Sequence, residues 1–184
     1  KTLKLSMVGY LHEIVEEFPY EIDGKAATPA APHLFDKDEH GILLSNNNSK
    51  IFHQVVAKVL WAAMRVRPDL LTALSYLTCQ VKAPDQDDMK KIIRMITYIR
   101  DTIDLPLTIG MNGSHEVLWW VDASFATRHQ LRSQTGAIMS MGLGSLYSMA
   151  RKQKLNTTSS TGAEIVGVHD AMSQFIWFRY FIMA

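Results

Sequence analysis

Cysteine is almost absent from this 184-residue chain, since Cys79 is the only one. A single thiol cannot form a disulfide within the chain, so nothing points to an oxidising compartment. No positively charged start is followed by an apolar segment and a small-residue cleavage site, which argues against a signal peptide. The apolar runs are too short and too often interrupted to span a bilayer. We therefore expect a protein that is not secreted and does not contact a membrane.

Net charge is also scarce, because the formal value is only +1 at pH 7. Hydrophobic residues make up 47% and charged residues 20% of the chain, which is typical of a globular protein and not of a disordered one. Residues 115–184 are mildly basic, with six Lys and Arg against four Asp and Glu, which is compatible with a polyanionic partner. Because the sequence begins with Lys1 and reaches Ala184 within a helical pattern, we expect a fragment of a longer protein.

The first part of the sequence predicts mainly helices. An alternating run predicts a short strand over residues 2–7, and apolar residues on one helix face predict a helix over 9–18. Residues 19–49 contain prolines, glycines and a Ser-Asn-Asn-Asn-Ser run, so we expect a surface connector without a packed element. Three further apolar stripes, joined by short connections, predict an antiparallel helical bundle over residues 51–64, 68–77 and 85–100.

After Pro106 the hydrophobic period changes from about 3.6 to about 2 residues. This change predicts strands over residues 107–109, 117–121, 136–141 and 145–149. The glycine-containing segment Met141–Gly144 predicts the tight turn between the last two strands. From Ala163 onward the helical period returns. Antiparallel strands followed by a helix on one face indicate an α+β fold.

Two acidic residues, Asp122 and Glu164, are the main candidates for chemistry. Asp122 follows the apolar run Val117–Val121, which predicts a buried strand that delivers the acid at its exposed end. Glu164 falls at the start of the last predicted helix. The two carboxylates could share one hard cation, and Mg²⁺ suits such a pair because it takes oxygen ligands and few protein groups.

Both acids also have a purely structural interpretation. Thr161–Glu164 fits a capping box, in which the glutamate bonds to the backbone of its own helix start. Asp122 could be a turn former. A third acid, Asp170, lies about 120° around the helix from Glu164 and is not expected to reach the same cation.

Two other charged runs are weaker candidates. Asp85–Asp88 follows Pro84 and is interpreted as a helix start, where acids complement the helix dipole. Arg151–Lys154 is either a solvated edge or a contact to a phosphate backbone.

Several motifs in the C-terminal part occur in an order and at a spacing that resemble a known family. They are VDAS at 121–124, RSQTG at 132–136, KQKLNT at 152–157 and SSTGAE at 159–164, followed by Trp177. With these motifs the chain resembles the ribonuclease H domain of copia-type retrotransposon polyproteins. Upstream, Arg67-Pro68-Asp69 and the helix after Pro84 resemble the segment that links the reverse transcriptase to this nuclease. The resemblance therefore covers nearly the whole chain.

The resemblance implies three parts. Residues 1–35 correspond to the end of the reverse transcriptase region, 36–106 to a helical, thumb-like connection, and 107–184 to the N-terminal half of a truncated ribonuclease H-like domain. The intact parent would be an RNA-directed DNA polymerase with ribonuclease H activity, located inside the cell in a cytoplasmic particle or in the nucleus. No polymerase box of the aromatic-x-Asp-Asp type is present, so this stretch is not expected to polymerise.

The resemblance also implies site roles. In this family an aspartate and a glutamate hold two Mg²⁺ ions beside the scissile phosphate of the RNA strand in an RNA–DNA hybrid, and these roles fall on Asp122 and Glu164. Ser160 and Thr161 match positions that contact the hybrid, and Lys152 lies in the basic run before them. The partners implied are the hybrid and the remainder of the polyprotein. The family's other catalytic acids follow this stretch, so the fragment is not expected to cleave well alone.

The sequence departs from the family pattern at two positions, and other hypotheses stay open. Gly162 replaces the usual glutamate, and Gln130 stands where relatives often carry aspartate. A second hypothesis is a non-catalytic remnant that binds nucleic acid or a partner protein. A third is a helical adaptor, which an entirely helical C-terminal part would support.

Overall fold

The computed structural model describes residues 1–38, 40–113, 116–128 and 131–184, and Gln130 lies outside these ranges. The described residues form helices and two antiparallel three-stranded sheets, which confirms the predicted α+β class. None of the described helices is long and apolar enough to cross a membrane. In chain order the elements are β1 (Thr2–Leu5), α1 (Val8–Glu16), α2 (Asn46–Ala63), the 3-10 helix η1 (Pro68–Leu70), α3 (Leu71–Gln80), α4 (Gln86–Asp101), β2 (Leu107–Met111), β3 (Leu118–Arg128), β4 (Arg132–Ser140), β5 (Gly142–Leu143), β6 (Tyr147–Lys152) and α5 (Ser160–Met183).

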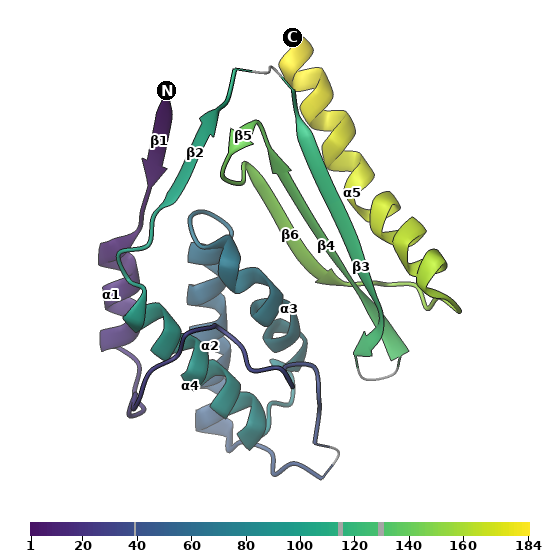
Figure 1. The fold of residues 1–184 in the computed structure, drawn as a ribbon. Coiled ribbons are helices and arrows are strands. Elements are labelled where there is room, and N and C mark those ends of the chain that lie inside the picture. The colour runs from purple at the N-terminus through teal and green to yellow at the C-terminus, as the bar shows by residue number, and fades with distance from the viewer. Residues whose placement is uncertain (39, 114–115, 129–130) are drawn as a thin grey trace.

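Helices α1 to α4 pack around one hydrophobic core, as their apolar stripes predict (Figure 1). The core includes Leu11 of α1, Phe52 of α2, Leu74 of α3 and Ile96 of α4, each at most 1% exposed. Helix α2 begins earlier than expected, because Ser45 is its N-cap and the polar Asn46–Asn48 run forms its first turn. The Ser45 hydroxyl accepts a hydrogen bond from the N–H of Asn48 at 3.4 Å, so a run typical of a loop also begins a helix.

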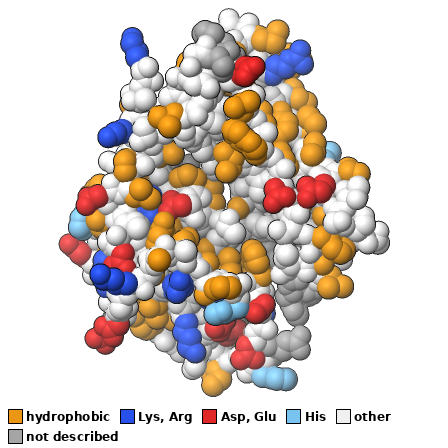
Figure 2. Space-filling view, in the orientation of Figure 1, with side chains coloured by type: hydrophobic (Ala, Val, Ile, Leu, Met, Phe, Trp, Pro, Cys, Tyr) orange, Lys and Arg blue, Asp and Glu red, His pale blue; other side chains and the backbone are white. Residues whose placement is uncertain are grey.

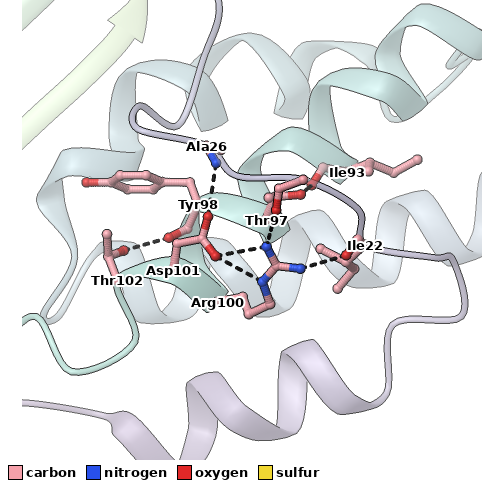
Figure 3. A network of polar contacts seen from close by, with 9 residues as sticks. Ile22, Ala26, Ile93, Thr97, Tyr98, Arg100, Asp101 and Thr102 are labelled. Carbon is pink, nitrogen blue, oxygen red and sulfur yellow. Dashed lines mark hydrogen bonds and ion pairs between the residues drawn. The ribbon is translucent and has the colours of Figure 1, made fainter.

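The connector between α1 and α2 lies across the helices and contains no helix or regular strand among its described residues. Arg100 of α4 donates a hydrogen bond to the carbonyl oxygen of Ile22 at 2.6 Å (Figure 3). The neighbouring Asp101 accepts one from the N–H of Ala26 at 3.0 Å, which lowers the pKa of Asp101 below its usual range. These contacts replace the secondary structure that the connector lacks, because they satisfy backbone groups that would otherwise be buried without partners.

Helix α4 begins with a reciprocal capping box, which confirms the prediction that the acidic run is a helix start. The Asp85 carboxylate accepts the N–H of Asp88 at 2.8 Å, and the Asp88 carboxylate accepts the N–H of Asp85 at 3.1 Å. Asp88 is only 1% exposed. Burial raises the pKa of the Asp88 carboxyl above its usual value, because an apolar environment disfavours the charged form.

Replacing Asp88 with asparagine is expected to make stability less sensitive to pH. At low pH the wild-type carboxyl is protonated in both the folded and the unfolded chain, so its burial carries no charge penalty. As the pH rises from about 4 through the raised folded pKa, the unfolded chain ionises freely and the folded chain does not, so the wild type loses stability relative to the variant. Urea denaturation between pH 4 and pH 8 measures this difference.

Asp87→Asn is the matched control, since Asp87 is a partly exposed neighbour paired with Lys91 at 2.8 Å. The difference in free energy of unfolding between Asp87→Asn and the wild type should not grow in favour of the variant as the pH rises. If the wild type gained stability over Asp88→Asn as the pH rose, the assignment of a raised pKa would be wrong.

The strands form two sheets, with orders β1-β2-β5 and β3-β4-β6. The predicted three antiparallel strands followed by a helix are confirmed in β3, β4, β6 and α5. The pairing of β2 with β1 was not expected, because β1 lies about a hundred residues earlier in the sequence. Helix α5 covers one face of the sheet β3-β4-β6. Helices α1 to α4 with their connector, called the helical half below, lie on the other side of this sheet (Figure 1). This sheet excludes an entirely helical C-terminal part, so the adaptor hypothesis loses its support.

The predicted tight turn at Met141–Gly144 is a wider excursion. Between β4 and β6 the chain turns aside to form β5, which pairs with β2 of the other sheet through Gly110↔Leu143 and Met111↔Gly142. Gly144 has a φ of +67°, a conformation that favours glycine. The two sheets are therefore joined at this excursion.

Candidate functional site

Asp122 lies in the middle of β3, not at its exposed end. The strand continues past it because Asp122 pairs with Gly136, and the register runs on to Ser124↔Gln134 before an irregularity. The small polar residues after the apolar run therefore stay in the sheet. The predicted strand end was wrong, because pairing with β4 outweighs the local change in polarity.

Side chains of β3 alternate between the two faces of the sheet. Trp119 packs on Phe175 of α5, with 3.9 Å between ring centroids. A Cβ at Gly167 of α5 would lie 3.5 Å from the Cβ of Ala123 and 3.6 Å from Val121. Residues 119, 121 and 123 thus face α5. Asp122 belongs to the opposite set.

On that opposite face Asp122 lines a cleft of about 450 Å³ between the sheet and the helical half. The space-filling view shows a hollow between these two parts of the molecule (Figure 2). Asp122 is exposed, and its β3 neighbours on this face are Trp120 and Ser124. The opposite wall of the cleft consists of Phe35 from the connector, Pro68 and Asp69 from η1, and Leu71 and Thr72 from α3.

Glu164 reaches the same strand from the α5 side. Its Oε1 accepts a hydrogen bond from the backbone N–H of Ala123 at 3.3 Å, although the two residues are 41 positions apart. The N-cap of α5 is Ser159, whose hydroxyl accepts from the N–H of Gly162 at 3.1 Å. The helix therefore starts before Thr161, and Glu164 is past the capping positions. The capping-box alternative for Glu164 is wrong.

The two acids thus approach neighbouring positions of β3 from different sides. β3 is an edge strand of its sheet, so a cation near both carboxylates would have to sit at this edge. Within the described ranges no group of three or more His, Cys, Asp or Glu residues is placed to hold a metal. Mg²⁺ commonly takes one or two carboxylates and completes its shell with water and phosphate oxygens. Asp122 and Glu164 are therefore compatible with part of a magnesium site, not with a complete protein cage.

Two buried glutamines, Gln134 and Gln153, hold this region together, and each lies within one of the motifs that carry the family resemblance. Gln153 is 0% exposed, and its Nε2 donates to the Thr135 hydroxyl at 3.0 Å and to the carbonyl oxygen of Ala163 at 2.9 Å. This contact fixes the α5 turn that carries Glu164. Gln134, on the other face, donates to the Ser75 hydroxyl at 3.0 Å and ties the sheet to α3. The motifs drew attention to these stretches, but only tertiary packing reveals what each glutamine holds.

The predicted hybrid-binding residues are all at the surface. Lys152 ends β6, and Ser160 and Thr161 open α5, each with an exposed side chain. Asp170 is engaged elsewhere, because it pairs with Arg151 at 3.0 Å and accepts from the Thr135 hydroxyl at 3.4 Å. Asp170 was not expected to reach the same cation as Glu164, and its carboxylate is engaged by Arg151 and Thr135.

Comparison with known proteins points to transposon polyproteins. The chain is 24% identical over 182 residues to the Transposon Ty1-DR6 Gag-Pol polyprotein of Saccharomyces cerevisiae and 25% identical over 182 residues to the Ty1-LR3 Gag-Pol polyprotein of the same yeast. Each alignment covers 94% of this chain and 10% of the relative, so the chain spans about one-tenth of the relatives' length. No family profile and no solved structure matches. Nearly the whole chain is therefore similar to a stretch of a retrotransposon Gag-Pol polyprotein.

Proposed function

We propose that this chain is a segment of a copia-type retrotransposon polyprotein that contains the end of the reverse transcriptase, its helical connection and the first half of a ribonuclease H domain. In the intact parent this last part cleaves the RNA strand of RNA–DNA hybrids. The observation that supports the nuclease most directly is the hydrogen bond from the N–H of Ala123 to Glu164. It brings a helix-borne carboxylate to the residue next to Asp122.

In this proposal Asp122 and Glu164 hold Mg²⁺, and the polyprotein supplies further ligands. The metal would provide the Lewis acid that stabilises charge on the phosphate. Exposed Ser160, Thr161 and Lys152 contribute hydrogen bonds and positive charge to the sugar–phosphate backbone of the hybrid. Gln153 acts as a positioning residue, because it holds the start of α5 against β4.

Replacing Asp122 with asparagine in the full-length parent is expected to reduce Mg²⁺-dependent cleavage of an RNA–DNA hybrid by at least about a hundredfold. Loss of a metal-holding carboxylate removes several kcal/mol of transition-state stabilisation. The assay measures the rate at which a labelled RNA strand is cut. Asp170→Asn is the matched control and should retain most of the activity, since Asp170 is paired with Arg151. Equal losses in both variants would contradict the proposed role of Asp122.

The alternative is a non-catalytic remnant that binds nucleic acid or a partner protein. The position of Asp122 favours it, because this side chain lines the cleft on the face opposite α5. If the wild-type parent is inactive with Mg²⁺ and yet binds the hybrid in a salt-sensitive way, the remnant is the better description.

A further inference from the structure

A second pocket lies in the helical half, away from Asp122 and Glu164. It has a volume of about 220 Å³ and is enclosed by the connector, α3 and α4. Its apolar lining includes Leu34, Ala73 and Leu77, which are 6%, 2% and 0% exposed. A short hydrocarbon group would find close contacts there.

The charged groups around this pocket are unevenly paired. The connector contributes His33, α3 contributes no charge, and α4 contributes Asp87, Lys90, Lys91 and Arg94. Lys91 is neutralised by Asp87 at 2.8 Å and also donates to the carbonyl oxygen of Asp36 at 2.6 Å. In the described part of the chain no carboxylate pairs with Lys90 or Arg94. Two positive charges therefore remain for a ligand.

Arg94 has a buried donor to spare. One of its terminal nitrogens, Nη2, donates to the hydroxyl of Thr28 in the connector at 3.0 Å. Its Nε–H is buried and has no hydrogen-bond partner within the described ranges. A buried N–H without an acceptor is costly, and such a group in a native fold calls for an explanation. This nitrogen has almost no accessible surface, so a ligand in the pocket would meet other parts of the guanidinium unless neighbouring side chains moved.

We propose that this pocket binds a carboxylate carried on a short apolar stem. The stem packs on Leu34, Ala73 and Leu77, and the carboxylate takes the guanidinium of Arg94, with Lys90 adding a second positive charge. Arginine suits this role because its planar fork matches a carboxylate. The same group could come from a free short-chain acid or from a glutamate side chain of a peptide. This inference is independent of the nuclease proposal, since no residue of that site lines the pocket.

Titration of the 184-residue chain with four probes, followed by NMR of the Leu34 and Leu77 methyl groups, tests the proposal. Butyrate has both the stem and the charge and is expected to produce saturable shifts. Acetate lacks the stem and butyramide lacks the charge, so both should bind at least about tenfold more weakly. N-acetyl-glutamate amide distinguishes the sources: binding as tight as butyrate indicates a peptide side chain, and weaker binding indicates a free acid.

Variants of the pocket keep the test decisive. Arg94→Gln is expected to weaken butyrate binding at least about tenfold, and Arg94→Lys should also weaken it because the planar fork is lost. Thr28→Val is the control: it removes the hydrogen bond to the connector and keeps the charge of Arg94, so butyrate binding should stay close to that of the wild type. Shifts that do not saturate, that persist in Arg94→Gln, or that are equal for butyrate and butyramide would overturn the proposal.

Discussion

Arg67→Ala is expected to lower the free energy of unfolding by about 2–5 kcal/mol, because the change opens a cavity and removes the donors of a fully buried side chain. Arg67 is 1% exposed, and its Nε and Nη2 donate to the Asp69 carboxylate at 3.0 and 2.8 Å. Its Nη1 and Nη2 also donate to the carbonyl and hydroxyl oxygens of Thr102, at 3.1 and 2.8 Å. The side chain therefore joins η1 to the end of α4. Alanine would open a cavity and remove these hydrogen bonds, whereas the exposed Asp69 carboxylate would be solvated by water.

Urea denaturation measures this loss, and two further variants define its origin. Arg65→Ala removes an exposed arginine that stacks on Trp61 at 3.1 Å, and should cost no more than about 1 kcal/mol. Arg67→Lys should recover little of the stability, because lysine cannot reproduce the fork of donors. A change below about 1 kcal/mol in Arg67→Ala would show that the ion pair adds nothing to the fold.

Gly144→Ala is expected to cost about 2–4 kcal/mol, the sum of backbone strain and overpacking. A Cβ at this position would lie 2.0 Å from the carbonyl oxygen of Thr108 in β2. The φ of +67° adds a conformation that alanine rarely adopts. Because the clash is with the backbone of Thr108 and the strain lies in the backbone of residue 144 itself, no side chain can move aside to relieve either one. The β5 segment must separate from β2, which thermal unfolding would reveal as a lower Tm.

Gly24→Ala separates the two causes. Gly24 has nearly the same φ, +70°, and a Cβ there would meet nothing within 4 Å. Its cost should be about 1–2 kcal/mol, the strain alone. Equal losses at Gly24 and Gly144 would mean that close packing against Thr108 does not matter.

Much of the fold could be predicted from the sequence, because its helices have apolar stripes and prolines or capping residues mark where helices begin. Pro84 and the acids after it define the start of α4 correctly, since a capping box is a local signal. The β1–β2 and β2–β5 pairings could not be predicted, because they join Leu3 to Ile109 and Met111 to Gly142 across long stretches of sequence. Strand partners depend on tertiary packing and leave little trace in local composition.

The candidate site was predictable in its parts and not in its geometry. The sequence identified Asp122 and Glu164, and the structure brings the glutamate to Ala123, beside the aspartate. Asp122 lies on its face of the sheet because β3 continues past it. The change from apolar to small polar residues after Val121 suggested instead that the strand ended there. The role of Gln153 was not predicted, because it depends on burial between β4 and α5.

Helix α5 has a consequence for handling the protein. Its inner side meets the sheet through small residues, Ala163, Gly167 and Ala171. Its outer side presents large apolar groups to water, including Trp177 and Phe181, which are 60% and 62% exposed and stacked on each other. Such a surface promotes self-association. Concentrated solutions of the isolated chain will therefore need a solubilising fusion partner or mild detergent to stay monodisperse.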